Sequence, residues 1–118
     1  MNRVIHFEIP ADNPEKLVNF YKNVFNWEIS KWEGPQEYWL VQTGENSEPG
    51  IDGAIIRSRD DFKSIVNTID VPDIDYYKEK IVENGGEILF DKMTIPNVGE
   101  LAYARDCEGT VFGIIQNL

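Results

Sequence analysis

The sequence predicts an α+β fold in which two βαβββ repeats form a curved, open eight-stranded sheet with the helices on its outside. Three observations lead to this prediction. Short segments of alternating apolar and polar residues indicate strands, each half contains one amphipathic helix, and the pattern restarts after about 60 residues. We therefore expect one domain over residues 1–118, made of two modules at about 1–59 and 60–118.

The first module is predicted to begin with a strand at residues 3–9, in which apolar side chains alternate with His6 and Glu8. Asp12 and Glu15 have the spacing of a capping box at the start of a helix, and Asn26 marks its expected end. Three further strands are expected over Trp27–Trp32, Glu37–Thr43 and Ile51–Arg57.

The second module repeats this order after a charged connector at residues 58–61. A strand is expected before Pro72 and Asp73, which cap the second helix, and Gly85 provides its left-handed stop. Residues 94–97 are expected to form a loop. The strands of this module are predicted over Ser64–Val71, Glu87–Phe90, Gly99–Arg105 and Thr110–Gln116.

Charge and composition restrict the partners. The 118 residues include 11 Lys and Arg and 21 Asp and Glu, so the formal net charge is −10. This charge argues against nucleic acid and an anionic membrane surface, and it favours cationic or neutral partners. The single cysteine, Cys107, excludes an internal disulfide and a cysteine metal cluster. The sequence shows no signal-peptide core and no apolar run near the ~20 residues of a membrane span, so a cytoplasmic location is expected.

Three segments of the chain carry a family resemblance: Val4–Ile9 (VIHFEI), Asn19–Trp27 (NFYKNVFNW) and Asp106–Gly113 (DCEGTVFG). They resemble the vicinal oxygen chelate superfamily of glyoxalases, bleomycin resistance proteins and dioxygenases, and most of all its small glyoxalase-related branch. The resemblance covers the whole chain and implies the fold predicted above. It also implies a homodimer, in which the second copy often completes the ligand cleft.

The resemblance implies four positions for the ligands of a divalent metal, on the first and last strands of each half. The first position falls on His6, and its counterpart in the second half falls on Val66 or Asn67. The last-strand positions fall on or near Gly53 and Gly113, which have no side chain to ligate. Because His6 is also the only histidine, at most one of the four ligands is present.

No metal site, no cofactor and no catalytic residue are therefore predicted. A divalent metal held by His6, Glu8 and a third carboxylate such as Glu37 or Glu100 is the alternative.

Strand alternation and the repeat give the expected ligand-binding residues. The apolar side chains of the first strand suit the helix side, so His6 and Glu8 are expected to face the cleft. If Gly53 also faces the cleft, Arg57 lies on the same face of its strand. Trp39 and Tyr103 are the aromatic candidates, and the alternative for both is a place in the hydrophobic core or in a dimer interface. The full expected set is His6, Glu8, Trp39, Arg57, Thr68 and Tyr103.

Three functional hypotheses follow. The first is a small-molecule-binding protein of the glyoxalase and bleomycin resistance family, with a degenerate metal site and a cationic or aromatic organic ligand in its concave cleft. The second is a divalent-metal-dependent lyase, isomerase or dioxygenase of the glyoxalase type that uses His6. The third is a dimeric accessory protein in which the cleft is vestigial.

Overall fold

The computed structural model describes residues 2–60 and 62–118, which group into two compact units. The N-terminal unit is His6–Ile65, and the C-terminal unit joins Val66–Leu118 with the first residues of the chain, up to Ile5. The predicted connector ends on Asp61, which lies outside the described residues. No helix in the described part of the chain is long and apolar enough to cross a membrane.

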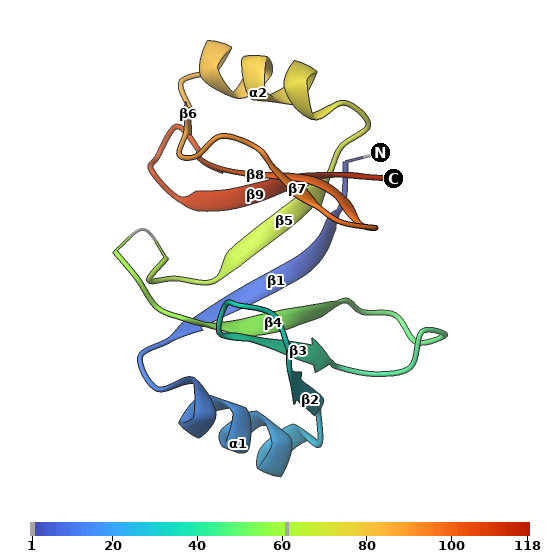
Figure 1. The fold of residues 1–118 in the computed structure, drawn as a ribbon. Helices are drawn as coiled ribbons and strands as arrows, with labels where there is room; N and C mark the ends of the chain where they lie inside the picture. The colour runs from blue at the N-terminus through green and yellow to red at the C-terminus, as the bar shows by residue number, and fades with distance from the viewer. Residues whose placement is uncertain (1, 61) are drawn as a thin grey trace. The chain divides into compact units, whose positions relative to one another are not determined.

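The N-terminal unit has the βαβββ order that the sequence predicts (Figure 1). Its elements are β1 (Val4–Ala11, which enters this unit at His6), α1 (Pro14–Phe25), β2 (Glu28–Lys31), β3 (Tyr38–Gln42) and β4 (Asp52–Arg57). The strands lie in the order β2-β3-β4-β1, and β1 pairs in parallel with β4 while the other pairs are antiparallel. The parallel pair is possible because the helix and two strands separate β1 from β4 in the sequence.

The helix α1 forms in the expected place, but the predicted capping box is wrong. Asn13 is the N-cap, and its side chain accepts a hydrogen bond from the backbone N–H of Lys16 at 3.3 Å. The carboxylate of Asp12 instead accepts a hydrogen bond from the hydroxyl group of Ser58. Asn26 ends the helix as predicted, in the left-handed conformation with φ 59°.

The C-terminal unit repeats the topology of the N-terminal unit. Its elements are β5 (Val66–Asp70), α2 (Ile74–Glu83), β6 (Glu87–Ile88), β7 (Met93–Ile95), β8 (Gly99–Arg105) and β9 (Val111–Asn117). The strands lie in the order β5-β9-β8-β6, and β5 pairs in parallel with β9 as β1 does with β4. Asp73 caps α2 and Gly85 has a positive φ of 92°, both as predicted.

One strand of this unit was expected to be a loop. The three residues of β7 pair with β8, and a tight turn that contains Asn97 at φ 65° joins the two strands. A strand this short, followed directly by Pro96, produces no alternating pattern in the sequence.

The first residues of the chain belong to the C-terminal unit, so the units differ at this end from the predicted modules. The carbonyl oxygen of Arg3 accepts a hydrogen bond from the backbone N–H of Asp70 at 2.8 Å. The side chain of Asn2 donates to the hydroxyl oxygen of Tyr77 at 2.9 Å. These contacts satisfy polar groups that a free terminus would leave to water.

Each unit has its own core between its helix and one face of its strands. Under α1, the buried side chains are Val18, Trp39, Val41 and Ile55, joined by partly buried neighbours that include Phe7 and Ile9. Under α2, the buried side chains are Val71, Ile74, Ala102 and Ile114. In both units the helix therefore covers one face of the strands, and the side chains of the other face are separate from that core.

The core under α1 explains Gly53. A Cβ atom added at this position would overlap the backbone carbonyl oxygen of Phe7 and its ring. The close approach of β1 to β4 therefore requires glycine, which agrees with the meaning of an isolated glycine inside a strand.

We expect Gly53→Ala to lower the free energy of unfolding by about 1–3 kcal/mol, because the backbone of β1 must move to accept the methyl group. Urea unfolding followed by circular dichroism measures this change. Ser47→Ala, in the exposed loop after β3, is the matched control and should stay within about 0.5 kcal/mol of the parent. Equal stability of Gly53→Ala and the parent would contradict the close approach.

Candidate functional site

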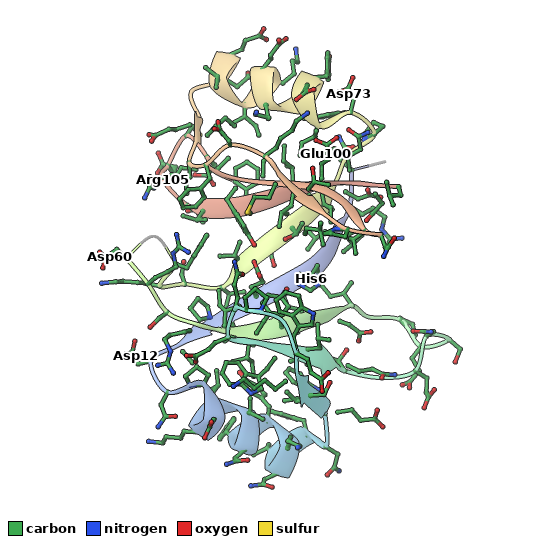
Figure 2. The ribbon with its side chains drawn as sticks, in the orientation of Figure 1. His6, Asp12, Asp60, Asp73, Glu100 and Arg105 are labelled. Carbon is green, nitrogen blue, oxygen red and sulfur yellow. The ribbon has the colours of Figure 1, made fainter. Side chains whose placement is uncertain are left out.

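The two faces of the strands in the N-terminal unit carry different chemistry. Residues that pair directly across strands share a face. Phe7 pairs with Gly53 and Ile9 with Ile55, and these positions belong to the core under α1. His6 and Glu8 alternate with them and therefore lie on the opposite face, which we call the non-helical face. His6 is labelled in Figure 2, where it lies on β1.

Four polar side chains form a row across this face. Glu28 on β2 pairs with Gln42 on β3, and Asp52 on β4 pairs with His6 on β1. The antiparallel pairing of β3 with β4 ends at Val41 and Gly53, and Gln42 and Asp52 are the next residues of these two strands. We call these four residues the polar row. They come from four strands, so their proximity depends entirely on strand register.

The neighbouring row on the same face is more apolar. Ser30 pairs with Leu40, Leu40 with Ala54, and Ala54 with Glu8. Ala54 is fully buried. Tyr38 lies on the same face of β3, and its hydroxyl group lies 3.0 Å from Nε2 of His6.

Tyr38 connects His6 with a buried carboxylate. Glu8 is only 4% exposed, and it forms a hydrogen bond with the side chain of Tyr38. A carboxylate can only accept, so the hydroxyl group of Tyr38 donates to Glu8. The single proton of the hydroxyl group is then used, and Nε2 of His6 must donate to Tyr38. This order fixes His6 as the neutral Nε2–H tautomer and leaves Nδ1 with a lone pair.

The electrostatics of the three side chains agree with this order. Burial lowers the pKa of His6 below 6.5, although the negative charges of Glu8 and Asp52 act in the opposite direction. Burial also raises the pKa of Tyr38, and the charge of Glu8 and its hydrogen bond raise it further. At neutral pH, His6 is therefore an uncharged base and Tyr38 is a protonated donor.

An open groove lies along β2 and β3 and includes most of the polar row of the non-helical face, and two residues of the helical face, Ile29 and Val41, also line it. Its volume is about 510 Å³, and its walls come from β2, β3, the loop after β3 and the start of β4. The lining residues are Glu28, Ile29, Ser30, Leu40, Val41, Gln42, Asn46 and Asp52. His6 lies on β1, next to Asp52 on β4, and is the last residue of the polar row.

Two of the predicted binding residues lie on the other face. Trp39 pairs with Ile55 and is 6% exposed in the core under α1. It is therefore a core residue, as the alternative interpretation has it. Arg57 pairs with Ala11 on the same helical face and forms an ion pair with Glu37 at 2.8 Å. Both side chains lie on the helical face and not on the expected cleft face, which the position of Gly53 implies for Arg57 and the repeat implies for Trp39. A one-residue error in register reverses the face of every side chain in a strand.

The other two predicted residues belong to the C-terminal unit and lie together there. Thr68 pairs with Gly113, and Gly113 pairs with Tyr103, on the face of the strands opposite to the core under α2. A Cβ atom at Gly113 would lie 3.0 Å from Oγ1 of Thr68 and 3.4 Å from the ring of Tyr103. Gly113 therefore provides the space in which these two buried side chains pack.

The residues present do not fit the divalent metal that the resemblance implies. Within residues 2–60 and 62–118, no group of three or more His, Cys, Asp or Glu side chains is placed to hold a metal ion. Oδ1 of Asp52 accepts a hydrogen bond from the backbone N–H of Thr43 at 2.9 Å, and Nε2 of His6 is bonded to Tyr38. One donor atom of each of these two side chains is therefore already bound to a protein partner.

Comparison with known proteins defines the class of this protein. The family model of the Glyoxalase/Bleomycin resistance protein/Dioxygenase superfamily matches residues 3–112, so the chain belongs to this superfamily. A search of the curated proteins found no match.

The solved structures show the same fold. A methylmalonyl-CoA epimerase of Streptomyces coelicolor, in complex with 2-nitronate-propionyl-CoA, is 14% identical with a TM-score of 0.73, over 99% of this chain and 95% of that one. A superfamily member from Vibrio splendidus 12B01 is 16% identical with a TM-score of 0.70 over 100% of both chains. At these identities the likeness shows the fold alone, and it confirms the predicted fold class.

Sequence reasoning missed Tyr38, Asp52, Gln42 and Glu28. The link between Tyr38 and His6 joins residues 32 positions apart, and no local motif signals it. Asp52 could have been found from the repeat, because it directly precedes Gly53, the position considered for a ligand. Glu28 and Gln42 carry no signal beyond the strand alternation that places them on one face.

The lowered pKa of His6 makes stability depend on pH. The unfolded chain binds a proton at His6 at higher pH than the folded chain, so the unfolded state is favoured as the pH falls below about 6.5. We expect the free energy of unfolding to decrease between about pH 7.5 and about pH 5.5. The variant His6→Gln keeps an N–H donor for Tyr38 but should lose this part of the dependence.

Urea unfolding of both proteins at the two pH values measures the effect. Because His6 is the only histidine, the difference between them isolates its contribution. An equal decrease in the parent and in His6→Gln would contradict the lowered pKa.

Proposed function

We propose that the chain binds a small cationic organic molecule in the groove of the non-helical face, without a metal ion. The observation that carries the proposal is the composition of this groove, which has two carboxylates, Glu28 and Asp52, and uncharged walls. Its volume of about 510 Å³ lies within the range of small-molecule pockets. An exposed apolar side chain, Leu40, provides a surface for the carbon atoms of a ligand.

The charges around the groove support a cation. Residues 28–52 contain six Asp and Glu side chains and one cationic side chain, Lys31. Lys31 does not neutralise the groove, because it shares the helical face with Trp39 and its Nζ lies 5.4 Å from the centre of that ring. The groove therefore has a negative potential that attracts cations and repels anions.

The negative charge of the groove also distinguishes the proposed ligand from the ligand of the similar epimerase. That protein is solved in complex with 2-nitronate-propionyl-CoA. The eight lining residues of the groove include no cationic side chain that could pair with an anionic ligand. The metal-dependent alternative that uses His6 has no support from the donor atoms described above. A homodimer and a cytoplasmic location stay predictions.

We expect Asp52→Asn and Glu28→Gln each to weaken binding of an organic cation by roughly two- to fivefold, since each removes one exposed charge. Both substitutions preserve side-chain shape. Calorimetric titration with a panel of organic ammonium compounds measures the dissociation constants. Glu15→Gln, on α1 and therefore on the other side of the strands, is the matched control and should leave them unchanged.

Raised salt should weaken binding as well, because the groove is open and its charges are screened. Binding of neutral or anionic compounds in preference to every cation would contradict the proposal. So would equal effects of Asp52→Asn and Glu15→Gln.

A further inference from the structure

We infer that the ligand is a linear diamine or polyamine, which places one N–H-bearing ammonium group near Glu28 and another near Asp52 and His6. This inference rests on the proposed function and makes it specific. Two properties of the polar row lead to it: its free polar atoms are acceptors apart from one N–H of Gln42, and its two carboxylates are separated by a full strand.

Each residue of the polar row offers an acceptor. One N–H of Gln42 Nε2 donates to the carbonyl oxygen of Gly44 at 3.2 Å, and the other N–H and Oε1 remain available. His6 donates through Nε2 to Tyr38, so Nδ1 has a lone pair. Within the described residues, Oδ2 of Asp52 and the carboxylate of Glu28 have no hydrogen-bond partner.

A row whose free polar atoms are mostly acceptors selects ligands that carry hydrogen-bond donors. A primary or secondary ammonium group is both positively charged and a donor of up to three hydrogen bonds. A quaternary ammonium group has the same charge but no N–H. In this groove it would leave the acceptors without hydrogen bonds, and the aromatic rings that usually hold such a group are absent from the eight lining residues.

The separation of the two carboxylates requires two ammonium groups. Glu28 lies on β2 and Asp52 on β4, with β3 between them. Neighbouring strands lie about 4.8 Å apart, so the two backbone positions are about 10 Å apart. The backbone N–H and the hydroxyl group of Thr43 both donate hydrogen bonds to Oδ1 of Asp52. These two bonds hold the Asp52 side chain in place and keep it from turning toward Glu28. One ammonium group therefore cannot contact both carboxylates.

Leu40 lies on the strand between Glu28 and Asp52. Its side chain provides an apolar surface for the carbon chain that would join the two ammonium groups. It pairs with Ala54 next to the polar row, lines the groove and is 44% exposed. A stretch of methylene groups laid over Leu40 would bury apolar surface at about 25 cal/mol per Å². An elongated aliphatic chain with a donor cation at each end matches this order of acceptor, apolar and acceptor surfaces.

The test compares ligands of equal chain length on the unmodified protein. Hexamethylenediamine has two N–H-bearing cations, hexamethonium has two quaternary cations on the same carbon chain, and hexylamine has only one cation. Calorimetric titration near pH 7.5, where His6 is neutral, gives their dissociation constants. We expect hexamethylenediamine to bind at least about tenfold more tightly than hexamethonium, because hydrogen bonds to charged groups are lost. Hexylamine should be weaker than the diamine by at least roughly threefold.

A substitution then tests whether one ammonium group of the diamine lies near Glu28. Glu28→Gln should weaken hexamethylenediamine and remove most of its advantage over hexylamine, while Glu15→Gln on α1 should change neither. Equal affinities for hexamethylenediamine and hexamethonium, both reduced by Asp52→Asn, would overturn this inference and leave the cation-binding groove in place. Failure of all three cations to bind would overturn the inference and the proposed function together.

Discussion

The parallel pairing of β1 with β4 is the contact on which the N-terminal unit depends. Its register sets His6 opposite Asp52 and Phe7 opposite Gly53. The strands approach so closely at Gly53 that no side chain fits there, and Phe7 is thereby held in the core under α1. A shift of one residue would place His6 under the helix and Phe7 on the non-helical face. The core and the polar row are therefore two consequences of one register.

Much of the fold could be predicted because its signals are local. Alternation located most strands, and the bounds of β8 agree with the prediction to the residue, Gly99–Arg105. The candidate site was predicted less well, since it depends on pairing between distant strands. His6 and Glu8 were placed on the correct face by the apolar residues between them. Arg57 was not, because a glycine gives no information about which face its strand presents.

The hydrogen bonds among Glu8, Tyr38 and His6 determine which ring nitrogen of His6 donates and which accepts. Glu8 is buried with its acceptors directed at protein partners, and the proton of Tyr38 goes to it. This arrangement uses the Nε2–H donor of His6 within the protein and leaves Nδ1 as an acceptor. The superfamily fold is thus combined here with a face that holds no metal-ligand set among the described residues.

The measurement that tests this account most directly is the tautomer of His6, observed by long-range proton–nitrogen correlation NMR at neutral pH. The only histidine of the chain gives a single pair of ring nitrogen signals, so no assignment is needed. The account predicts a protonated Nε2 and an unprotonated Nδ1, and a change to mixed tautomers in Tyr38→Phe. A protonated Nδ1, or an imidazolium ring at neutral pH, would contradict it.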